Sequence, residues 1–193
     1  MSKKSNAPVT SEDFNKAYRA PITFWGDVRI PGELKEIVKT QKPETSLELG
    51  CGLGRFSLFL ADRGIKATAV DFSSVAIEKA KKRVANDESW PAFMVGDVTN
   101  LKMINGQFDV SFDVGCFHCL NEEDQQKYVS EVYRLLAPGG THLIWAMDHS
   151  PGNIILNPAS IAEVFEPRFQ LVNSKFSRRR IVASHWYWLV RSK

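Results

Sequence analysis

Glycines and acidic residues stand in the first half of the chain at spacings that suit the binding of a nucleotide. The loop glycines are Gly50, Gly52 and Gly54, directly after a short apolar segment. Glycine lets a loop turn sharply and lets its backbone approach a ligand closely, because no side chain is in the way. Asp71 closes the next apolar segment, about 20 residues beyond the first glycine, where such folds hold ribose hydroxyls. The pattern therefore predicts a cofactor that carries adenosine.

Two further residues favour a positively charged cofactor over a dinucleotide. The dinucleotide fingerprint needs glycine or alanine five positions after its first glycine, where this chain has Arg55. Glu48 precedes the loop on a strand that we expect to be covered on both faces. A buried carboxylate needs a cationic partner and repels a pyrophosphate, but it attracts the ammonium and sulfonium groups of S-adenosyl-L-methionine. The sequence therefore predicts a sulfonium cofactor.

Short apolar segments alternate with amphipathic ones and predict the scaffold that positions these residues. Strands are expected at residues 46–49, 66–70, 92–95, 108–112, 142–147, 169–176 and 184–190. The alternation predicts an α/β fold, in which helices cover both faces of a doubly wound, mostly parallel sheet. Asn121 is expected to begin a helix that ends before Pro138. Ligands bind such sheets beyond the carboxyl ends of the strands, so the site is expected there.

Five motifs, in order, resemble those of the class I S-adenosylmethionine-dependent methyltransferases. They are the glycine loop at 47–56, the strand end at 69–74, the turn at 96–98, the segment 108–118 and the turn at 135–140. The likeness runs from about residue 43 to the C-terminus. It implies a Rossmann-like sheet of seven strands with the last strand antiparallel beside the fifth. It also implies S-adenosyl-L-methionine as cofactor and S-adenosyl-L-homocysteine as product.

The resemblance assigns roles to residues in these motifs. Asp71 is expected to bind the ribose, Asp97 and Val98 the adenine edge, and Phe72 to flank the adenine ring. A turn-forming or helix-capping role is the alternative for the two aspartates. Asp109 is expected to be structural. The other expected cofactor-binding residues are Trp25, Glu48, Gly50, Cys51, Gly52, Gly54 and Asp113.

His118 follows the fourth predicted strand and is the candidate catalytic base. A packing or cofactor-contact role for this histidine stays open. Methyl transfer asks the protein mainly to hold a nucleophile in line with the methyl carbon. A thiol, with a pKa of about 8.5, can react without a base, whereas a phenol at about 10 usually needs one. We therefore expect a small-molecule acceptor with sulfur, oxygen or nitrogen as the reacting atom, and sulfur is favoured.

The N-terminal segment is expected to close over the site. Residues 1–40 would form a cap on the same domain as residues 41–193, the methyltransferase domain. The stretch around Trp25 loosely resembles the entry segment of thiol and thiopurine methyltransferases, whose tryptophan helps to enclose the cofactor. Plain core packing is the alternative for this tryptophan.

Cysteine and histidine near the fourth strand have half of the pattern of a zinc site. Cys116, His118 and Cys119 are close in sequence, and Cys51 would join them if the first and fourth strands are neighbours. No metal is expected, because a second closely spaced pair of ligands is missing. The odd number of cysteines, 3, gives no sign of a secreted disulfide framework and favours a reducing, cytoplasmic location.

Composition limits the remaining function classes. The chain has 193 residues, 44% hydrophobic and 24% charged, with a net charge of +3. Its scattered basic residues do not predict a nucleic-acid partner, and no stretch approaches the roughly 18 apolar residues that span a bilayer. We expect a monomer or homodimer with a small-molecule substrate. A catalytically silent cofactor sensor or regulator, or a nicotinamide-dependent oxidoreductase on the same architecture, stays open.

Overall fold

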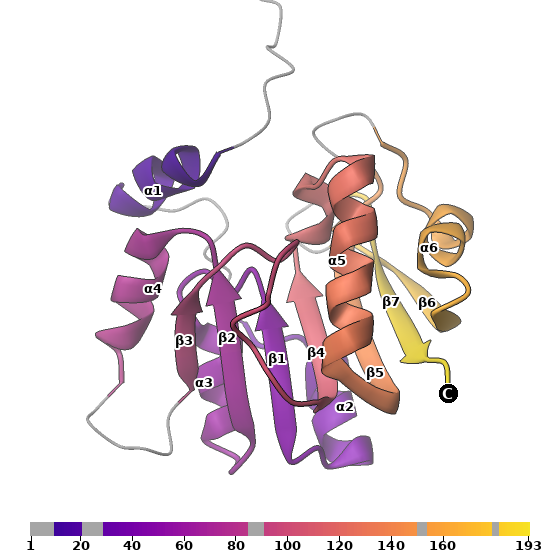
Figure 1. Ribbon diagram of the computed structural model, residues 1–193, viewed down its shortest axis with the longest axis horizontal. Helices are drawn as coiled ribbons and strands as arrows, with labels where there is room; N and C mark the ends of the chain where they lie inside the picture. The colour runs from indigo at the N-terminus through magenta and orange to yellow at the C-terminus, as the bar shows by residue number, and fades with distance from the viewer. Residues whose placement is uncertain (1–9, 21–28, 85–90, 150–153, 179–181) are drawn as a thin grey trace, which may run out of the picture.

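A seven-stranded sheet crosses the centre of the molecule, with helices on both faces (Figure 1). The computed structural model describes residues 10–20, 29–84, 91–149, 154–178 and 182–193. The strands are β1 (Thr45–Leu49), β2 (Lys66–Asp71), β3 (Ala92–Val95), β4 (Phe108–Val114), β5 (Leu136–Met147), β6 (Phe169–Ser177) and β7 (Ser184–Arg191). Their order is β3-β2-β1-β4-β5-β7-β6, with β7 antiparallel to both of its neighbours. The predicted fold class is confirmed, including the antiparallel last strand beside the fifth.

The helices bury apolar stripes against the two faces of the sheet. They are α1 (Ser11–Arg19), α2 (Gly32–Gln41), α3 (Arg55–Ala61), α4 (Ser74–Lys81), α5 (Glu122–Leu135) and α6 (Pro158–Phe165), with a 3₁₀ turn η1 (Phe117–Cys119). Leu34 of α2 and Leu60 of α3 share one core cluster with Trp145. Val132 of α5 and Phe165 of α6 belong to the other large cluster. The sheet is therefore shielded on both sides, and its carboxyl edge is left to form a site.

Local sequence explains where α5 begins, and β5 starts directly where α5 ends. The Asn121 side chain accepts a hydrogen bond from the Asp124 amide at 2.9 Å and so caps α5 as predicted. β5 begins at Leu136, directly after the helix, rather than at the predicted residue 142. In the pairing of β4 with β5, residues 137–140 lie opposite the single residue Asp109, because the register of the two strands shifts there. The turn predicted from the proline and two glycines is therefore a bulge inside the strand.

Helix α1 docks on the amino end of α4. The Asn15 Oδ1 atom accepts hydrogen bonds from the Ser73 hydroxyl at 2.7 Å and from the Val75 amide at 3.3 Å. Lys79 of α4 donates to the Tyr18 carbonyl. Because Ser73 is the N-cap residue of α4 and follows β2 closely, α1 lies near the carboxyl ends of the first strands (Figure 1).

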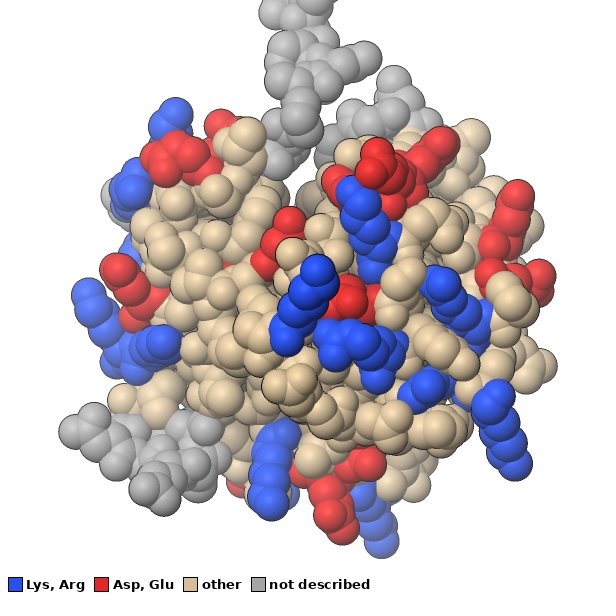
Figure 2. Space-filling view, viewed as in Figure 1, with Lys and Arg blue, Asp and Glu red and all other residues tan. Residues whose placement is uncertain are grey.

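The surface of the α5 side carries both signs of charge. Figure 2 shows basic and acidic side chains interspersed on this face. Two pairs on α5 contribute: Arg134 with Glu131 at 2.7 Å and Lys127 with Glu123 at 2.8 Å. Such exposed pairs add little stability. Within the described ranges, no helix has the length and apolar character needed to cross a bilayer.

Candidate cofactor and acceptor site

Motif residues from neighbouring strands meet at the carboxyl edge of the sheet. β1 lies between β2 and β4, with Leu49 in register with Val70 on one side and Asp113 on the other. The order of the strands in the sheet reverses at β1: the chain continues from β1 to β2 on one side of it, and β4 lies on its other side. Ligands of open parallel sheets bind at such a point. The predicted location of the site and the observed topology agree.

The glycine loop is held in a conformation that suits glycine, against close neighbours. Gly50, Gly52 and Gly54 all have positive φ angles, of 69°, 52° and 70°. A Cβ atom on Gly52 would lie 2.6 Å from the Tyr18 hydroxyl, and one on Gly50 would lie 2.6 Å from the Cys116 Cβ. Side chains at these two positions would be strained and would collide. The loop therefore has α1 on one side and the end of β4 on the other.

Asp71 ties the glycine loop to the start of α4. Its Oδ2 atom accepts a hydrogen bond from the Gly52 amide at 2.8 Å, and its Oδ1 atom accepts one from the Ser73 amide at 2.9 Å. Burial raises the pKa of this carboxyl despite both bonds. Each oxygen keeps a further lone pair, which can accept from a ligand hydroxyl. The turn-forming role and a ligand-binding role are compatible in this geometry.

Glu48 is buried at 3% exposure beneath the glycine loop. Its Oε2 atom accepts from the Ser57 amide at 3.0 Å and the Ser57 hydroxyl at 2.5 Å. Burial raises the pKa of Glu48 to about 8, and the nearby carboxylates of Asp71 and Asp113 act in the same direction. Without a positive partner, Glu48 therefore carries a proton at neutral pH. Ser57 was missed from sequence, although its place in the first turn of α3 is the available signal.

Asp113 holds the turn that follows β4. Its Oδ1 atom accepts from the Cys116 amide at 2.7 Å, and its Oδ2 atom accepts from the Phe117 amide at 2.6 Å and the Tyr128 hydroxyl at 3.1 Å. Burial raises its pKa to about 6. Asp113 shapes the site indirectly, because the turn that it holds places Cys116 next to Gly50 of the glycine loop. Direct contact of Asp113 with the cofactor stays a prediction.

A buried polar chain extends from Asp113 into the core. The Tyr128 hydroxyl lies 3.1 Å from the Nε2 atom of His142, and the Nδ1 atom of His142 lies 2.8 Å from the Ser111 hydroxyl. Burial lowers the pKa of His142 to about 3, so the ring is neutral. Sequence reasoning missed this chain, because its members lie on three separate elements.

His118 lies on η1, buried at 5% exposure. Its Nδ1 atom accepts a long hydrogen bond of 3.5 Å from the Met147 amide, and its ring meets Trp145 edge-on at 5.8 Å. A neutral ring that accepts at Nδ1 carries its proton on Nε2. The sequence prediction that His118 is the base remains untested.

The residues expected at the adenine end lie on the ends of β2 and β3. Phe72 is half-buried, and its ring meets Phe14 of α1 at 5.0 Å. Asp97 is exposed and accepts from the Thr99 amide at 2.8 Å and hydroxyl at 2.7 Å, while Val98 is buried in the core. Trp25 lies outside the described residues.

The three cysteines near this edge of the sheet are thiols. Within the described part of the chain, no group of three or more histidine, cysteine or acidic residues is placed to hold a metal ion. Cys51, Cys116 and Cys119 form no disulfide bonds. Burial raises the pKa of Cys51 and of Cys116, so both stay protonated at neutral pH. Protonated thiols are poor nucleophiles and poor ligands.

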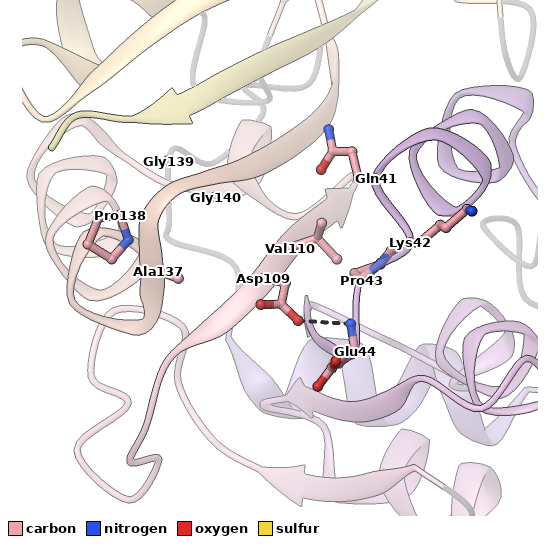
Figure 3. A pocket seen from close by; sticks show the side chains of 10 residues that line it. All are labelled: Gln41, Lys42, Pro43, Glu44, Asp109, Val110, Ala137, Pro138, Gly139 and Gly140. Carbon is pink, nitrogen blue, oxygen red and sulfur yellow. Dashed lines mark hydrogen bonds between the residues drawn. The ribbon is translucent and has the colours of Figure 1, made fainter.

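A hollow of about 410 Å³ lies at the opposite, amino edge of the sheet (Figure 3). Its walls include the bulge of β5 and the segment that enters β1. Here the Asp109 Oδ2 atom accepts hydrogen bonds from the Glu44 amide at 2.8 Å, the Thr45 amide at 2.9 Å and the Thr45 hydroxyl at 3.0 Å. Asp109 therefore joins β4 to the start of β1, far along both strands from the glycine loop.

Residues 47–140, which contain the glycine loop and the β4 turn, match the family model of the methyltransferase domain. This part of the chain, just under half of its length, is similar to methyltransferase domains. Two uncharacterized methyltransferases of Schizosaccharomyces pombe are each 33% identical to it over 89 residues, which is 46% of this chain and 61% of theirs. The matched region thus spans less than two thirds of these curated relatives.

Solved structures share the fold of this chain. One, described as concerning the conversion of a disulfide bond into a thioacetal group during echinomycin biosynthesis, has a TM-score of 0.78 at 20% identity and covers 94% of this chain and 91% of its own. The 1,6-didemethyltoxoflavin-N1-methyltransferase of Burkholderia thailandensis has a TM-score of 0.76 at 19% identity, covering 97% and 93%. At this identity the comparison concerns the fold.

Proposed function

We propose that this protein is a methyltransferase, which transfers the methyl group of S-adenosyl-L-methionine to a small molecule and releases S-adenosyl-L-homocysteine. The observation that carries the proposal is the set of buried carboxylates around the glycine loop. Glu48 is close enough to Asp71 and Asp113 for their charges to raise its pKa. Buried like charges oppose folding unless a positive ligand offsets them. The cofactor's ammonium and sulfonium groups are such a ligand.

The residues at this edge fit the cofactor. Gly50 and Gly52 give the loop its left-handed turns and let it pack against Cys116 and Tyr18, and a glycine loop of this kind suits close approach of a ligand to its backbone. Asp71 offers oriented carboxylate oxygens to the ribose hydroxyls. Phe72 and Asp97 lie at the next strand ends, beside the expected adenine position. The neighbour from Burkholderia thailandensis is described with bound S-adenosylhomocysteine, which supports the same cofactor for this chain.

The protein's contribution to the reaction is placement and the exclusion of water. When bound, the cofactor supplies an electrophilic methyl group on a positively charged sulfur. Holding the acceptor in line with that carbon can contribute about 7–11 kcal/mol. The acceptor atom is sulfur, oxygen or nitrogen, and sulfur is favoured because a thiol needs the least help in losing its proton.

Turnover with a panel of acceptors tests the proposed function. The purified protein is incubated with S-adenosyl-L-methionine and thiols, phenols or amines, and methylated product and S-adenosyl-L-homocysteine are measured by mass spectrometry. Formation of both with at least one acceptor is the expected result. Tight cofactor binding without transfer to any acceptor would favour a sensor or regulator instead. A thermal shift with NAD and none with S-adenosyl-L-homocysteine would favour an oxidoreductase.

A further inference from the structure

A second pair of titratable side chains lies at the carboxyl edge, beyond the glycine loop and His118. Asp148 directly follows β5, and His185 is the second residue of β7. The Oδ1 atom of Asp148 lies 2.7 Å from the Nδ1 atom of His185, and the two side chains are 24% and 20% exposed. The Met147 amide, which bonds to His118, belongs to the residue before Asp148. The pair therefore continues the edge on which His118 lies.

The pair fixes which nitrogen of His185 can take a proton. A carboxylate only accepts hydrogen bonds, so Nδ1 carries the ring proton and Nε2 presents a lone pair. Among the residues that the structure describes, nothing hydrogen-bonds to this Nε2 atom. An acidic residue that orients a histidine in this way is the arrangement used for general bases. His185 thus presents a basic nitrogen at this edge of the sheet.

Aromatic and apolar side chains surround the pair. The His185 ring stacks on Tyr187 at 5.8 Å and meets Phe176 edge-on at 5.3 Å. Phe176 is 52% exposed and Ile155 is 57% exposed. The segment that contains Ile155 lies beside Asp148, because the next residue, Leu156, donates its amide to the Asp148 carbonyl. The guanidinium of Arg178 lies over Phe176 at 6.0 Å. Exposed aromatic and aliphatic surface beside a basic nitrogen suits a ligand with an aromatic ring.

We propose that His185, oriented by Asp148, takes the proton from an aromatic hydroxyl that accepts the methyl group, a step that rests on the proposed function. The O–H bond breaks and its proton goes to Nε2, while an oxygen electron pair forms the new O–C bond. The C–S bond breaks with its electron pair on sulfur, which becomes neutral. The imidazolium then passes its proton to water. Products are a methyl ether and S-adenosyl-L-homocysteine.

The spacing of the strands is compatible with this step. β5 lies between β4 and β7, and neighbouring strands are about 4.8 Å apart, so β4 and β7 are separated by about 10 Å. A reacting distance of about 3 Å and an O–H···N bond of about 2.8 Å fit within that separation. Sulfur is favoured on sequence because a thiol can react without a base, whereas this pair supplies the base that a phenol needs.

Acceptors of different acidity separate a proton-accepting role from a structural one. His185→Gln should lower kcat for phenol and catechol about 100-fold and remove the fall in rate at low pH. Methylation of thiophenol at pH 8.5 should change less than about threefold, because a thiol ionises without help. Asp148→Asn should lower phenol turnover about tenfold. His149→Gln, an exposed histidine next to the pair, is the matched control and should change neither reaction.

Each outcome decides for or against His185. If His185→Gln loses activity equally with phenol and thiophenol, the residue has a structural role and the proposal is overturned. The proposal is also overturned if the wild-type protein binds S-adenosyl-L-homocysteine but methylates only thiols, or methylates no acceptor. A wild-type protein that binds no S-adenosyl-L-homocysteine would instead refute the proposed function. If thermal unfolding shows that His185→Gln does not fold, Asp148→Asn keeps an acceptor for Nδ1–H and carries the test.

Discussion

β4 has an aspartate near each of its ends, and the two carboxyls behave in opposite ways. Asp113, at the carboxyl end, is fully buried, and burial raises its pKa to about 6 although two amides and a hydroxyl donate to it. Asp109, at the amino end, is exposed. Burial is the largest single influence and raises its pKa, but the hydrogen bonds from Thr45 and Glu44 together outweigh it and the pKa is lowered overall. Similar hydrogen bonds thus give opposite results, because burial differs.

The two edges of the sheet therefore use acidic residues for different purposes. At the amino edge an ionised Asp109 joins two strands and stabilises the fold. At the carboxyl edge Glu48, Asp71 and Asp113 all have raised pKa values, which means that their charged forms are disfavoured. Side chains kept in such surroundings mark a ligand site. The comparison predicts that substitutions at the carboxyl edge affect cofactor binding and that those at the amino edge affect stability.

The largest effect is expected from replacing one aspartate with asparagine at each edge of the sheet. Asp71→Asn should weaken S-adenosyl-L-homocysteine binding at least about 100-fold, because an amide is a poorer acceptor for ribose hydroxyls and the loop loses a charge-assisted bond. Asp109→Asn should leave the affinity within about twofold and lower the free energy of unfolding by about 1 kcal/mol. Calorimetric titration and urea unfolding measure the two quantities. Equal losses of affinity in both variants would break the comparison.

The pH dependence of cofactor affinity should follow Glu48. Its pKa is about 8 in the ligand-free protein, so binding of a cation releases its proton. Affinity for S-adenosyl-L-methionine should therefore rise by up to about tenfold per pH unit below pH 8 and level off above it. Titrations between pH 6 and 9 check this. Glu48→Gln should flatten the dependence, and an unchanged slope in that variant would assign the proton to another group.

Stability of the ligand-free protein should change with pH in opposite directions at the two edges. The folded pKa of Glu48 lies above its ordinary value of 4.5, so its stabilising contribution is complete below pH 4.5 and is lost as pH rises through 8. The folded pKa of Asp109 is lowered, so its contribution is present above 3.8 and is lost on acidification. The free energy of unfolding, measured with urea across the pH range, should fall with rising pH in the wild-type protein but not in Glu48→Gln. Its fall on acidification should be absent in Asp109→Asn.

Glycines with positive φ allow a smaller test at each edge. Gly52 has a φ of 52° and lies against the Tyr18 hydroxyl, whereas Gly139 has a φ of 78° and nothing within 4 Å of an added Cβ. Alanine at either position should cost about 1–2 kcal/mol of stability through backbone strain. Gly52→Ala alone should also lower cofactor affinity, by about fivefold, because α1 must shift. A matching loss of affinity in Gly139→Ala would contradict the assignment of the edges.

The smallest effect is expected within the buried polar chain. Tyr128→Phe removes the hydroxyl that donates to Asp113 and leaves a nitrogen of His142 without a partner. The free energy of unfolding should fall by about 1–2 kcal/mol, while cofactor affinity changes less than about threefold. Tyr133→Phe, on the same helix, is the control and should be neutral. Complete loss of binding in Tyr128→Phe would mean that the chain acts on the ligand directly.

Sequence reasoning located the sheet and its edge but not the long-range contacts across it. Alternating apolar segments and the glycine loop are local signals, and they predicted the strands and the positions of Glu48 and Asp71. The bond from Tyr128 to Asp113 depends on how α5 lies against β4, and the contact of Tyr18 with Gly52 depends on the docking of α1. Neither follows from spacing along the chain. The bulge in β5 was missed because its proline and glycines also fit an ordinary turn.

Calorimetric titration of the wild-type protein with S-adenosyl-L-methionine, and separately with NAD, at pH 8 tests the central claim most directly. The buried acidic edge should bind the sulfonium cofactor at one site per chain and give no heat with NAD. Folded protein that gives no heat with S-adenosyl-L-methionine, or that binds NAD in its place, would contradict the account.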